Sequence, residues 1–349
     1  MTAALAPLRL SLAALGLGLT CSCSYLVFDE PGESAAEVFD QVWADFDQYY
    51  GLFEVKGVDW DQQYAELAPA PGDDLSEAEL HARLVALLEP LDDKHVSLFP
   101  AGSSLPTWSV DLVDGRFPTP PLDLALIKAD YLDGDWIAPH PLVFAGRLSP
   151  TIGYVHIAEF GGSLRSYEKA FDAVFEQLDG VEAMVVDVRD NPGGFDPIVQ
   201  LVANRFATER AVYMRARKRN GPGRADFGPA QVWEVEPVGP GFRGPVALLT
   251  TYATQSAGET FTLAMRRRAG LVQIGDTTAG AFSDNIMREA GNGWTYTISV
   301  GDYRDHEGVS WEGVGLAPDL EIVNTAEDLE AGQDRVLEAA IARLAEPVP

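Results

Sequence analysis

Cysteine is scarce in this sequence, which has only Cys21 and Cys23 among its 349 residues. Both stand near the start of the chain, so the rest can hold no disulfide framework, no cysteine-based metal site and no cysteine nucleophile. They directly follow an apolar run from Leu10 to Leu19, which is about half of the roughly 20 residues that a membrane helix needs. We therefore predict a signal peptide over residues 1–23 and export of the protein.

The two cysteines leave two destinations open. Lipoprotein signal peptides are cleaved before a cysteine that then carries a lipid, and Cys23 or Cys21 stands in that position. The protein would then be attached to a membrane through this lipid, in the periplasm or at the outer membrane. Plain secretion is the alternative. The sequence does not determine the oligomeric state.

Positive charge is also scarce, with 25 Lys and Arg against 53 Asp and Glu and a formal net charge of −28. Such an excess repels phosphate backbones and anionic lipid headgroups at long range. The net charge therefore argues against nucleic acid and anionic membrane surfaces as partners. Lysine is especially rare, and none follows Lys218. Hydrophobic residues nevertheless make up 46% of the chain, which is enough for a sizeable buried core.

The first part of the expected fold, residues 34–100, has the pattern of helices. Apolar residues recur at three- and four-residue spacing over 35–46, and Ser76 with Glu79 forms a capping box before another apolar run. We expect a small helical N-terminal domain here. Residues 101–150 are rich in proline and are expected to form an irregular β-rich connector.

Strands and helices alternate over residues 151–349, which predicts an α/β domain with a largely parallel sheet. A stretch rich in glycine and proline, 220–245, interrupts the alternation and is a candidate substrate-facing loop. The expected elements are strands near 152–158, 183–188, 246–249 and 272–274, a β-rich stretch at 294–300, and helices near 166–178, 197–206, 257–268 and 327–344.

Two motifs follow buried strands of this domain, where α/β sheets place their ligands. The first, DVRDNPGG, ends in Gly193 and Gly194, whose backbone can approach a substrate closely and direct N–H groups at a developing negative charge. An ordinary Gly-Gly turn is the alternative. The second places Ser256 between a strand and a helix, with the N–H of Ala257 beside it. A capping box formed by Ser256 and Glu259 is the structural alternative there.

A reactive serine needs a base within hydrogen-bond reach, and histidine is the base best matched to neutral pH. His95 is the strongest candidate among the five histidines, because it ends the predicted helical domain in the sequence LDDKHVSL. His306, in a charged loop, is its rival.

Five segments in order resemble the core motifs of the tail-specific (C-terminal-processing) serine peptidases. The likeness covers nearly the whole chain and implies a crotonase-like α/β core with a small helical N-terminal domain. The segments are IGYVHIAEF at 152–160, VVDVRDNPGG at 185–194, VALLT through SAGE at 246–259, IGDTTAG at 274–280 and EGVGLAPD at 312–319.

This family has two catalytic arrangements. One uses a lysine that follows the serine, and no lysine follows Lys218 here. The sequence resembles the other branch, that of the tricorn core peptidase, which takes a histidine from an N-terminal helical domain and a late glutamate. The resemblance makes His95 the base and Glu312 the residue that orients or charges it. In that branch a serine beside the histidine carries the contact to the glutamate, whereas Lys94 stands here, so a direct contact, a water or another residue remain open.

The resemblance also implies the reaction. Ser256 would hydrolyse peptide bonds in peptides or unfolded proteins through an acyl-enzyme, with Gly193, Gly194 and Ala257 as the oxyanion hole and with no metal or organic cofactor. Residues 101–150 are too short for the PDZ domain that many members carry. A non-catalytic ligand- or peptide-binding module on the same fold is the alternative, and the presence of Ser256 and His95 favours the enzyme.

Overall fold

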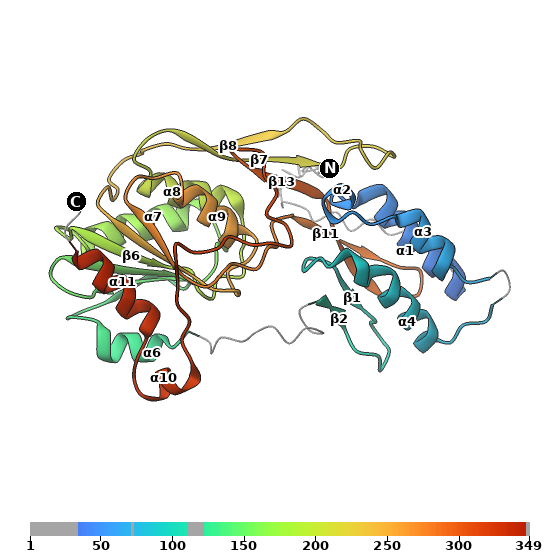
Figure 1. Ribbon diagram of the computed structural model, residues 1–349, viewed down its shortest axis with the longest axis horizontal. Helices are drawn as coiled ribbons and strands as arrows, with labels where there is room; N and C mark the ends of the chain where they lie inside the picture. The colour runs from blue at the N-terminus through green and yellow to red at the C-terminus, as the bar shows by residue number, and fades with distance from the viewer. Residues whose placement is uncertain (1–33, 71–72, 111–121, 347–349) are drawn as a thin grey trace, which may run out of the picture.

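A computed structural model of the chain describes residues 34–70, 73–110 and 122–346. A helical part with a small sheet lies at one end of the molecule, and a larger α/β part lies at the other (Figure 1). Cys21, Cys23 and the predicted signal peptide lie outside the described residues. None of the helices in the described ranges has the length and apolar content that a membrane-spanning helix needs.

The N-terminal helices begin where the sequence provides caps. Ser34 and Ser76 both form capping boxes, with Glu37 and Glu79 as the reciprocal partners. The helices bury Phe46, Trp60 and other apolar side chains in one core, as expected for this segment. They are α1 (Ala35–Tyr49), α2 (Phe53–Lys56), α3 (Trp60–Leu67) and α4 (Glu77–Leu88), followed by the short η1 (Glu89–Leu91).

A hairpin from much later in the chain completes this core. Strands β11 (Asn285–Glu289) and β12 (Thr295–Ser299) pair with β1 (Ser97–Phe99) and β2 (Trp108–Ser109) in the order β11-β12-β1-β2. Trp294 and Tyr296 of the hairpin are buried against the helices. The helical part is therefore not closed on residues 34–100, because the downstream hairpin supplies part of its apolar core.

The larger part is built on a seven-stranded sheet with the order β14-β10-β9-β6-β5-β4-β3. All neighbours from β14 to β5 are parallel, which confirms the largely parallel sheet. The strands are β3 (Ile137–His140), β4 (Val143–Arg147), β5 (Ile152–Ile157), β6 (Ala183–Asp187), β9 (Val246–Thr250), β10 (Leu271–Gly275) and β14 (Leu320–Glu321).

Two strands that precede residue 151 extend the sheet of the larger part. β3 and β4 belong to the stretch 101–150 that was expected to be a connector, yet β4 pairs antiparallel with β5 and extends the sheet. Antiparallel pairing at a sheet edge needs no crossover helix, so β4 and β5 follow one another directly in the chain. The same stretch also contains α6 (Leu124–Leu126) and η2 (Ile127–Tyr131).

Helices cover both faces of this sheet (Figure 1). α7 (Leu164–Gln177), α8 (Asp196–Phe206) and α9 (Ala257–Met265) pack on one face, and α11 (Arg335–Ala345) packs on the other. The single closing helix expected over 327–344 is two helices, because Gly332 takes a φ of 77° between α10 (Ala326–Glu330) and α11. A left-handed glycine ends a helix in this way.

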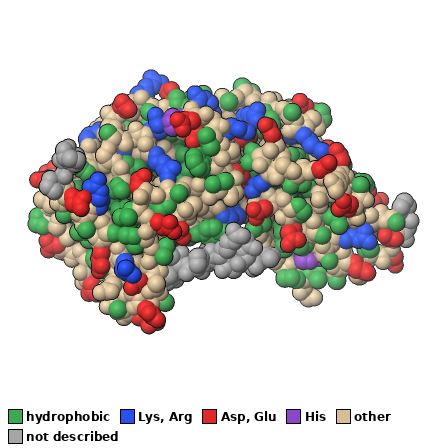
Figure 2. All heavy atoms as spheres, in the orientation of Figure 1, with side chains coloured by type: hydrophobic (Ala, Val, Ile, Leu, Met, Phe, Trp, Pro, Cys, Tyr) green, Lys and Arg blue, Asp and Glu red, His purple; other side chains and the backbone are tan. Residues whose placement is uncertain are grey.

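A third sheet, not predicted from the sequence, lies over α8 and α9. It has the order β13-β7-β8, from β7 (Ala211–Lys218), β8 (Gln231–Val235) and β13 (Gly301–Asp305). The excursion 220–245 thus contains a strand as well as loops. On the face shown in Figure 2, Asp and Glu side chains are spread over both ends of the molecule, in keeping with the net charge of −28.

Candidate active site

Ser256 lies at a strained turn between β9 and α9. Its backbone has φ 51° and ψ −120° immediately before the helix begins at Ala257, a conformation that costs a residue with a Cβ about 1–3 kcal/mol. The side chain makes no capping hydrogen bond with the helix. The capping-box interpretation of Ser256 is therefore wrong, and its Oγ is not engaged by the N–H groups of the helix.

Glu259 holds the segment that supports this turn. Its buried carboxylate accepts hydrogen bonds from the N–H of Gly280 (2.7 Å), the N–H of Ala281 (2.6 Å) and the hydroxyl of Thr278 (2.5 Å). The carbonyl of Ala281 in turn accepts the N–H of Ser256 at 2.9 Å. Burial raises the pKa of Glu259 to about 7. Sequence reasoning saw only a helix cap here and missed this structural role.

The Gly193-Gly194 turn packs directly against the serine. A Cβ on Gly193 would lie 2.6 Å from the Cβ of Ser256 and 3.0 Å from the nitrogen of Ala257. The N–H of Gly193 donates to Oδ1 of Asn191 at 2.9 Å. Within the described part of the chain, the N–H groups of Gly194 and Ala257 donate to no protein acceptor.

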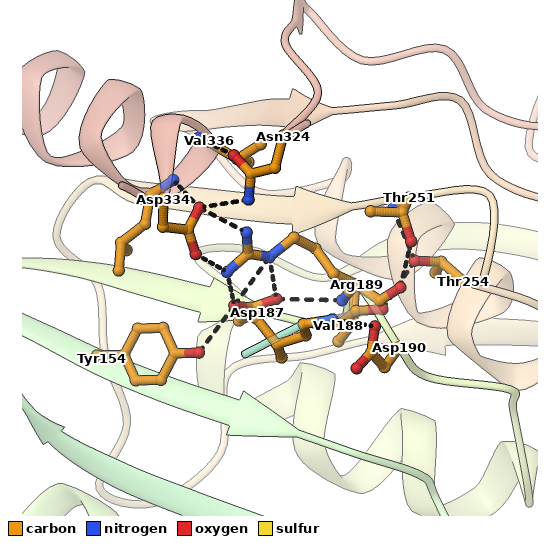
Figure 3. A network of polar contacts seen from close by, with 12 residues as sticks. Tyr154, Asp187, Val188, Arg189, Asp190, Thr251, Thr254, Asn324, Asp334 and Val336 are labelled. Carbon is orange, nitrogen blue, oxygen red and sulfur yellow. Dashed lines mark hydrogen bonds and ion pairs between the residues drawn. The ribbon is translucent and has the colours of Figure 1, made fainter. Parts of the chain in front are cut away.

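A buried ion-pair network fixes the strand end that leads to this turn (Figure 3). The guanidinium of Arg189 contacts Asp187 at 2.7 Å and Asp334 at 2.8 Å, and all three side chains are at most 3% exposed. The hydroxyl of Thr254 donates to the carbonyl of Val188 at 2.7 Å. The first motif is therefore anchored by buried side chains, and the hydroxyl of Thr254 joins it to the loop that leads to the serine.

His95 lies shortly after Asp92, whose φ is 43°. Among the described residues other than glycine, Asp92 and Ser256 have a positive φ. The N–H of His95 donates to Oδ1 of Asp93 at 2.9 Å. The carbonyl of His95 accepts the hydroxyl of Thr297 on β12 at 2.6 Å, and this hydroxyl also accepts the N–H of Ser97. The late hairpin thus fixes the backbone that follows the histidine, while Asp93 holds its N–H.

The residue before the histidine connects it to the serine turn. Lys94 donates to the carbonyl of Ala279, and its ammonium lies 4.0 Å from the ring centre of Tyr252. Two residues after Ala279, the carbonyl of Ala281 accepts the N–H of Ser256. One short segment, 279–281, therefore contacts both the histidine loop and the serine turn.

Glu312 lies on the other side of this segment. Its buried Oε2 accepts the N–H groups of Phe282 (2.9 Å) and Ser283 (3.1 Å). Burial and the negative charge of Asp93 raise the pKa of Glu312 to about 8. Within the described residues, Oε1 of Glu312 and Oδ2 of Asp93 are both buried and accept no hydrogen bond.

Lys56 lies between the glutamate and the histidine loop. Its ammonium donates to the carbonyl of Asp92 at 2.6 Å and lies 3.1 Å from the position that a Cβ on Gly313 would take. The loop that carries Asp93 is therefore next to Glu312. The ammonium of Lys94, by comparison, donates to the carbonyl of Ala279. Asp93 was not singled out from the sequence, because nothing in its spacing distinguishes it from Asp92.

His306, the rival base, lies elsewhere. Its Nε2 is 2.9 Å from a guanidinium nitrogen of Arg267, and its carbonyl accepts Arg215. Across the described ranges, no group of three or more His, Cys, Asp and Glu side chains is placed to hold a metal ion.

Comparisons with known proteins agree on one family. A sequence model described as peptidase family S41 matches residues 151–322. The chain is 30% identical over 209 residues to tricorn protease homolog 2 of Streptomyces coelicolor, covering 59% of this chain and 16% of the relative. It is 26% identical over 131 residues to the carboxy-terminal processing protease CtpB of Bacillus subtilis, covering 37% of this chain and 25% of the relative. The chain thus spans at most a quarter of the length of these two relatives.

Solved structures extend the likeness to most of the described fold. A crystal structure of a peptidase from Parabacteroides merdae superposes with a TM-score of 0.76 at 27% identity, covering 90% of this chain and 98% of the other. The tricorn protease superposes with a TM-score of 0.55 at 17% identity, covering 89% of this chain and 36% of the other, and this second likeness concerns the fold alone.

Proposed function

Residues 151–322 of this chain belong to peptidase family S41, and on that premise we propose that the protein is a serine peptidase with Ser256 as nucleophile and His95 as general base. One observation carries the proposal. Ser256 is held in a strained strand-to-helix turn, without a capping role, beside two N–H groups that have no protein acceptor within the described residues. Strain of this kind is kept where function requires it.

The proposed reaction follows from these positions. Oγ of Ser256 attacks the carbonyl carbon of a peptide bond while His95 takes its proton. The N–H groups of Gly194 and Ala257 stabilise the oxyanion that forms. His95 then gives the proton to the leaving amine, and water hydrolyses the acyl-enzyme by the same route in reverse.

Glu312 and Asp93 are proposed to position the histidine. Asp93 accepts the N–H of His95, and its charge is one cause of the raised pKa of Glu312. A neutral Glu312 avoids placing a second negative charge beside that of Asp93 in a buried site. This arrangement would replace the serine that links glutamate and histidine in the tricorn-type branch.

The substrates proposed are peptides or unfolded proteins, since two relatives carry the names carboxy-terminal processing protease and C-terminal processing peptidase. We further propose that the larger part has the crotonase-like topology and that the protein is exported, with lipid attached at Cys23 or Cys21 as the finer possibility. Mass spectrometry of the mature N-terminus would decide whether a lipid is present.

Hydrolysis of a fluorescently labelled unfolded protein tests the proposed function. Wild type should release labelled peptides, and Ser256→Ala should reduce the rate by at least about 10³-fold, since the nucleophile of such a catalytic unit contributes this much or more. Ser166→Ala, in the first turn of α7, is the matched control and should keep wild-type activity. Equal activity of Ser256→Ala and wild type would refute the assignment.

A further inference from the structure

The side chain of Lys94 joins three segments of the proposed active site. It extends from the loop that carries His95, its neighbour in the chain. Its ammonium donates to the carbonyl of Ala279 and lies 4.0 Å from the ring centre of Tyr252. Tyr252 belongs to the short loop between β9 and the turn of Ser256. One cation therefore connects the histidine loop to the loop before the serine and to the segment of Ala279.

Both segments that Lys94 contacts are fixed to the serine turn by other hydrogen bonds. The N–H of Ala279 donates to the carbonyl of Thr254 at 3.1 Å, and the carbonyl of Ala281 accepts the N–H of Ser256 at 2.9 Å. The hydroxyl of Thr254 also donates to the carbonyl that follows β6. These stretches and the serine turn therefore form one hydrogen-bonded unit, so a contact with either of them is a contact with the framework of the nucleophile.

Two further contacts of the histidine loop lead to the helical part instead. The carbonyl of His95 accepts the hydroxyl of Thr297 on β12, and the carbonyl of Asp92 accepts the ammonium of Lys56 on α2. Both partners belong to the N-terminal helices and the hairpin that completes their core. Lys94 therefore links the two parts of the molecule at the point where the proposed base must meet the nucleophile.

The partners of Lys94 are groups that bind a cation. A carbonyl oxygen accepts a charge-assisted hydrogen bond from an ammonium, and the face of a tyrosine ring attracts a positive charge. Burial raises the pKa of Glu259 to about 7, and the positive charge of Lys94 is among the effects that oppose this rise. A neutral side chain of similar length, such as methionine, would keep the apolar contacts and lose these three interactions.

We propose that Lys94 is a positioning residue, which holds His95 in place against the turn of Ser256. It does so by fixing the histidine loop to Ala279 and Tyr252, and it acts through this backbone rather than on the substrate. In the tricorn-type branch a serine in this place contacts the late glutamate, so the cation and its two partners replace that contact here. This inference rests on the proposed peptidase function and adds a residue to it.

Hydrolysis of the labelled unfolded protein by three variants tests the inference. Lys94→Met should lower kcat about 10- to 10²-fold and change KM less than about twofold, because a misplaced base slows the reaction without weakening substrate binding. Lys94→Arg should recover kcat to within about threefold of wild type, since arginine also donates to carbonyls and lies over aromatic rings. Lys128→Met is the matched control, because the ammonium of Lys128 lies 4.3 Å from the ring centre of Trp136, away from the site, and it should keep the wild-type kcat.

Double variants show whether Lys94 acts through its partners. When His95→Ala is already present, Lys94→Met should slow fluorophosphonate labelling of Ser256 by less than about a further twofold, because no histidine is left to position. Lys94→Met and Tyr252→Leu should be less than additive in their effects on kcat, whereas Lys128→Met and Tyr252→Leu should be additive. Full additivity of Lys94→Met with both partners would overturn the inference.

Labelling of the wild type separates the two ways to fail. If Ser256 is labelled but Lys94→Met hydrolyses at the wild-type rate, the positioning role is refuted and the peptidase stands. The same holds if Lys94→Arg is as slow as Lys94→Met, because arginine keeps its proton and this result would make Lys94 itself the base. If the wild type is neither labelled nor active, the proposed function falls and the inference with it. Should urea unfolding show that Lys94→Met does not fold, Tyr252→Leu carries the same prediction for kcat.

Discussion

At the scale of single residues, Gly193 packs closely against Ser256. The glycine has φ 119° and leaves no room for a methyl group. Gly180 offers a matched comparison, because its φ is also positive, at 82°, and a Cβ there would meet nothing within 4 Å.

Gly193→Ala should therefore abolish activity, whereas Gly180→Ala should not. Both variants should lose about 1–3 kcal/mol of unfolding free energy from the positive φ. Only Gly193→Ala should also displace Ser256 and lower the hydrolysis rate, by at least about 10²-fold. Urea unfolding and the protein-hydrolysis assay measure the two effects. Full activity of a folded Gly193→Ala would contradict the close packing.

The raised pKa of Glu312 makes stability depend on pH. The folded-state pKa of about 8 exceeds the unfolded value of 4.5, so the folded protein binds this proton more tightly. The resulting stabilisation is complete below about pH 4.5 and is lost as the pH rises to about 8.

Glu312→Gln should remove this dependence. The unfolding free energy of wild type relative to the variant should fall by about 1 kcal/mol per pH unit between pH 5 and pH 8. Glu168→Gln, on the exposed side of α7, is the control and should follow wild type at every pH. Chemical unfolding at several pH values measures this, and parallel curves for wild type and Glu312→Gln would show that the carboxyl has no raised pKa.

At the scale of elements, the ion-pair network around Arg189 connects β6 to the start of α11. Arg189 and its partners Asp187 and Asp334 are at most 3% exposed. Removing the cation would leave two buried carboxylates without a counter-charge.

Arg189→Met should lower the unfolding free energy by about 3–5 kcal/mol. Arg210→Met is the matched control, because Arg210 pairs with Glu234 at the surface, with the two side chains 69% and 36% exposed. Such exposed pairs contribute little, so this variant should unfold at nearly the wild-type urea concentration. Equal midpoints for the two variants would refute a stabilising role for the network.

The sequence was informative for elements with a strong local pattern. Buried β6 and β9 were recognisable as apolar runs, and the capping boxes at Ser34 and Ser76 are local signals. The third sheet was not predicted, because the alternating arginines of β7 indicate neither a buried nor an exposed strand. The side chain of Glu259 was misread for a related reason, since a capping box and a buried carboxylate that holds a distant loop have the same local spacing.

At the scale of the whole molecule, the late hairpin unites the two parts. Arg288 on β11 donates two hydrogen bonds of 2.9 Å to Asp45 on α1, and Thr297 on β12 holds the carbonyl of His95. No local pattern reveals these contacts, since they join residues far apart in the chain. The resemblance to a family, rather than periodicity, predicted that His95 serves the same site as Ser256.

The central claim, that Ser256 is a nucleophile activated by His95, is tested most directly by the rate of fluorophosphonate labelling, with the labelled residue mapped by mass spectrometry. Wild type and His306→Ala should be labelled at Ser256 at similar rates. His95→Ala should be labelled at least about 10²-fold more slowly, and Ser256→Ala not at all. Labelling of His95→Ala as fast as wild type, or labelling at another residue, would contradict the claim.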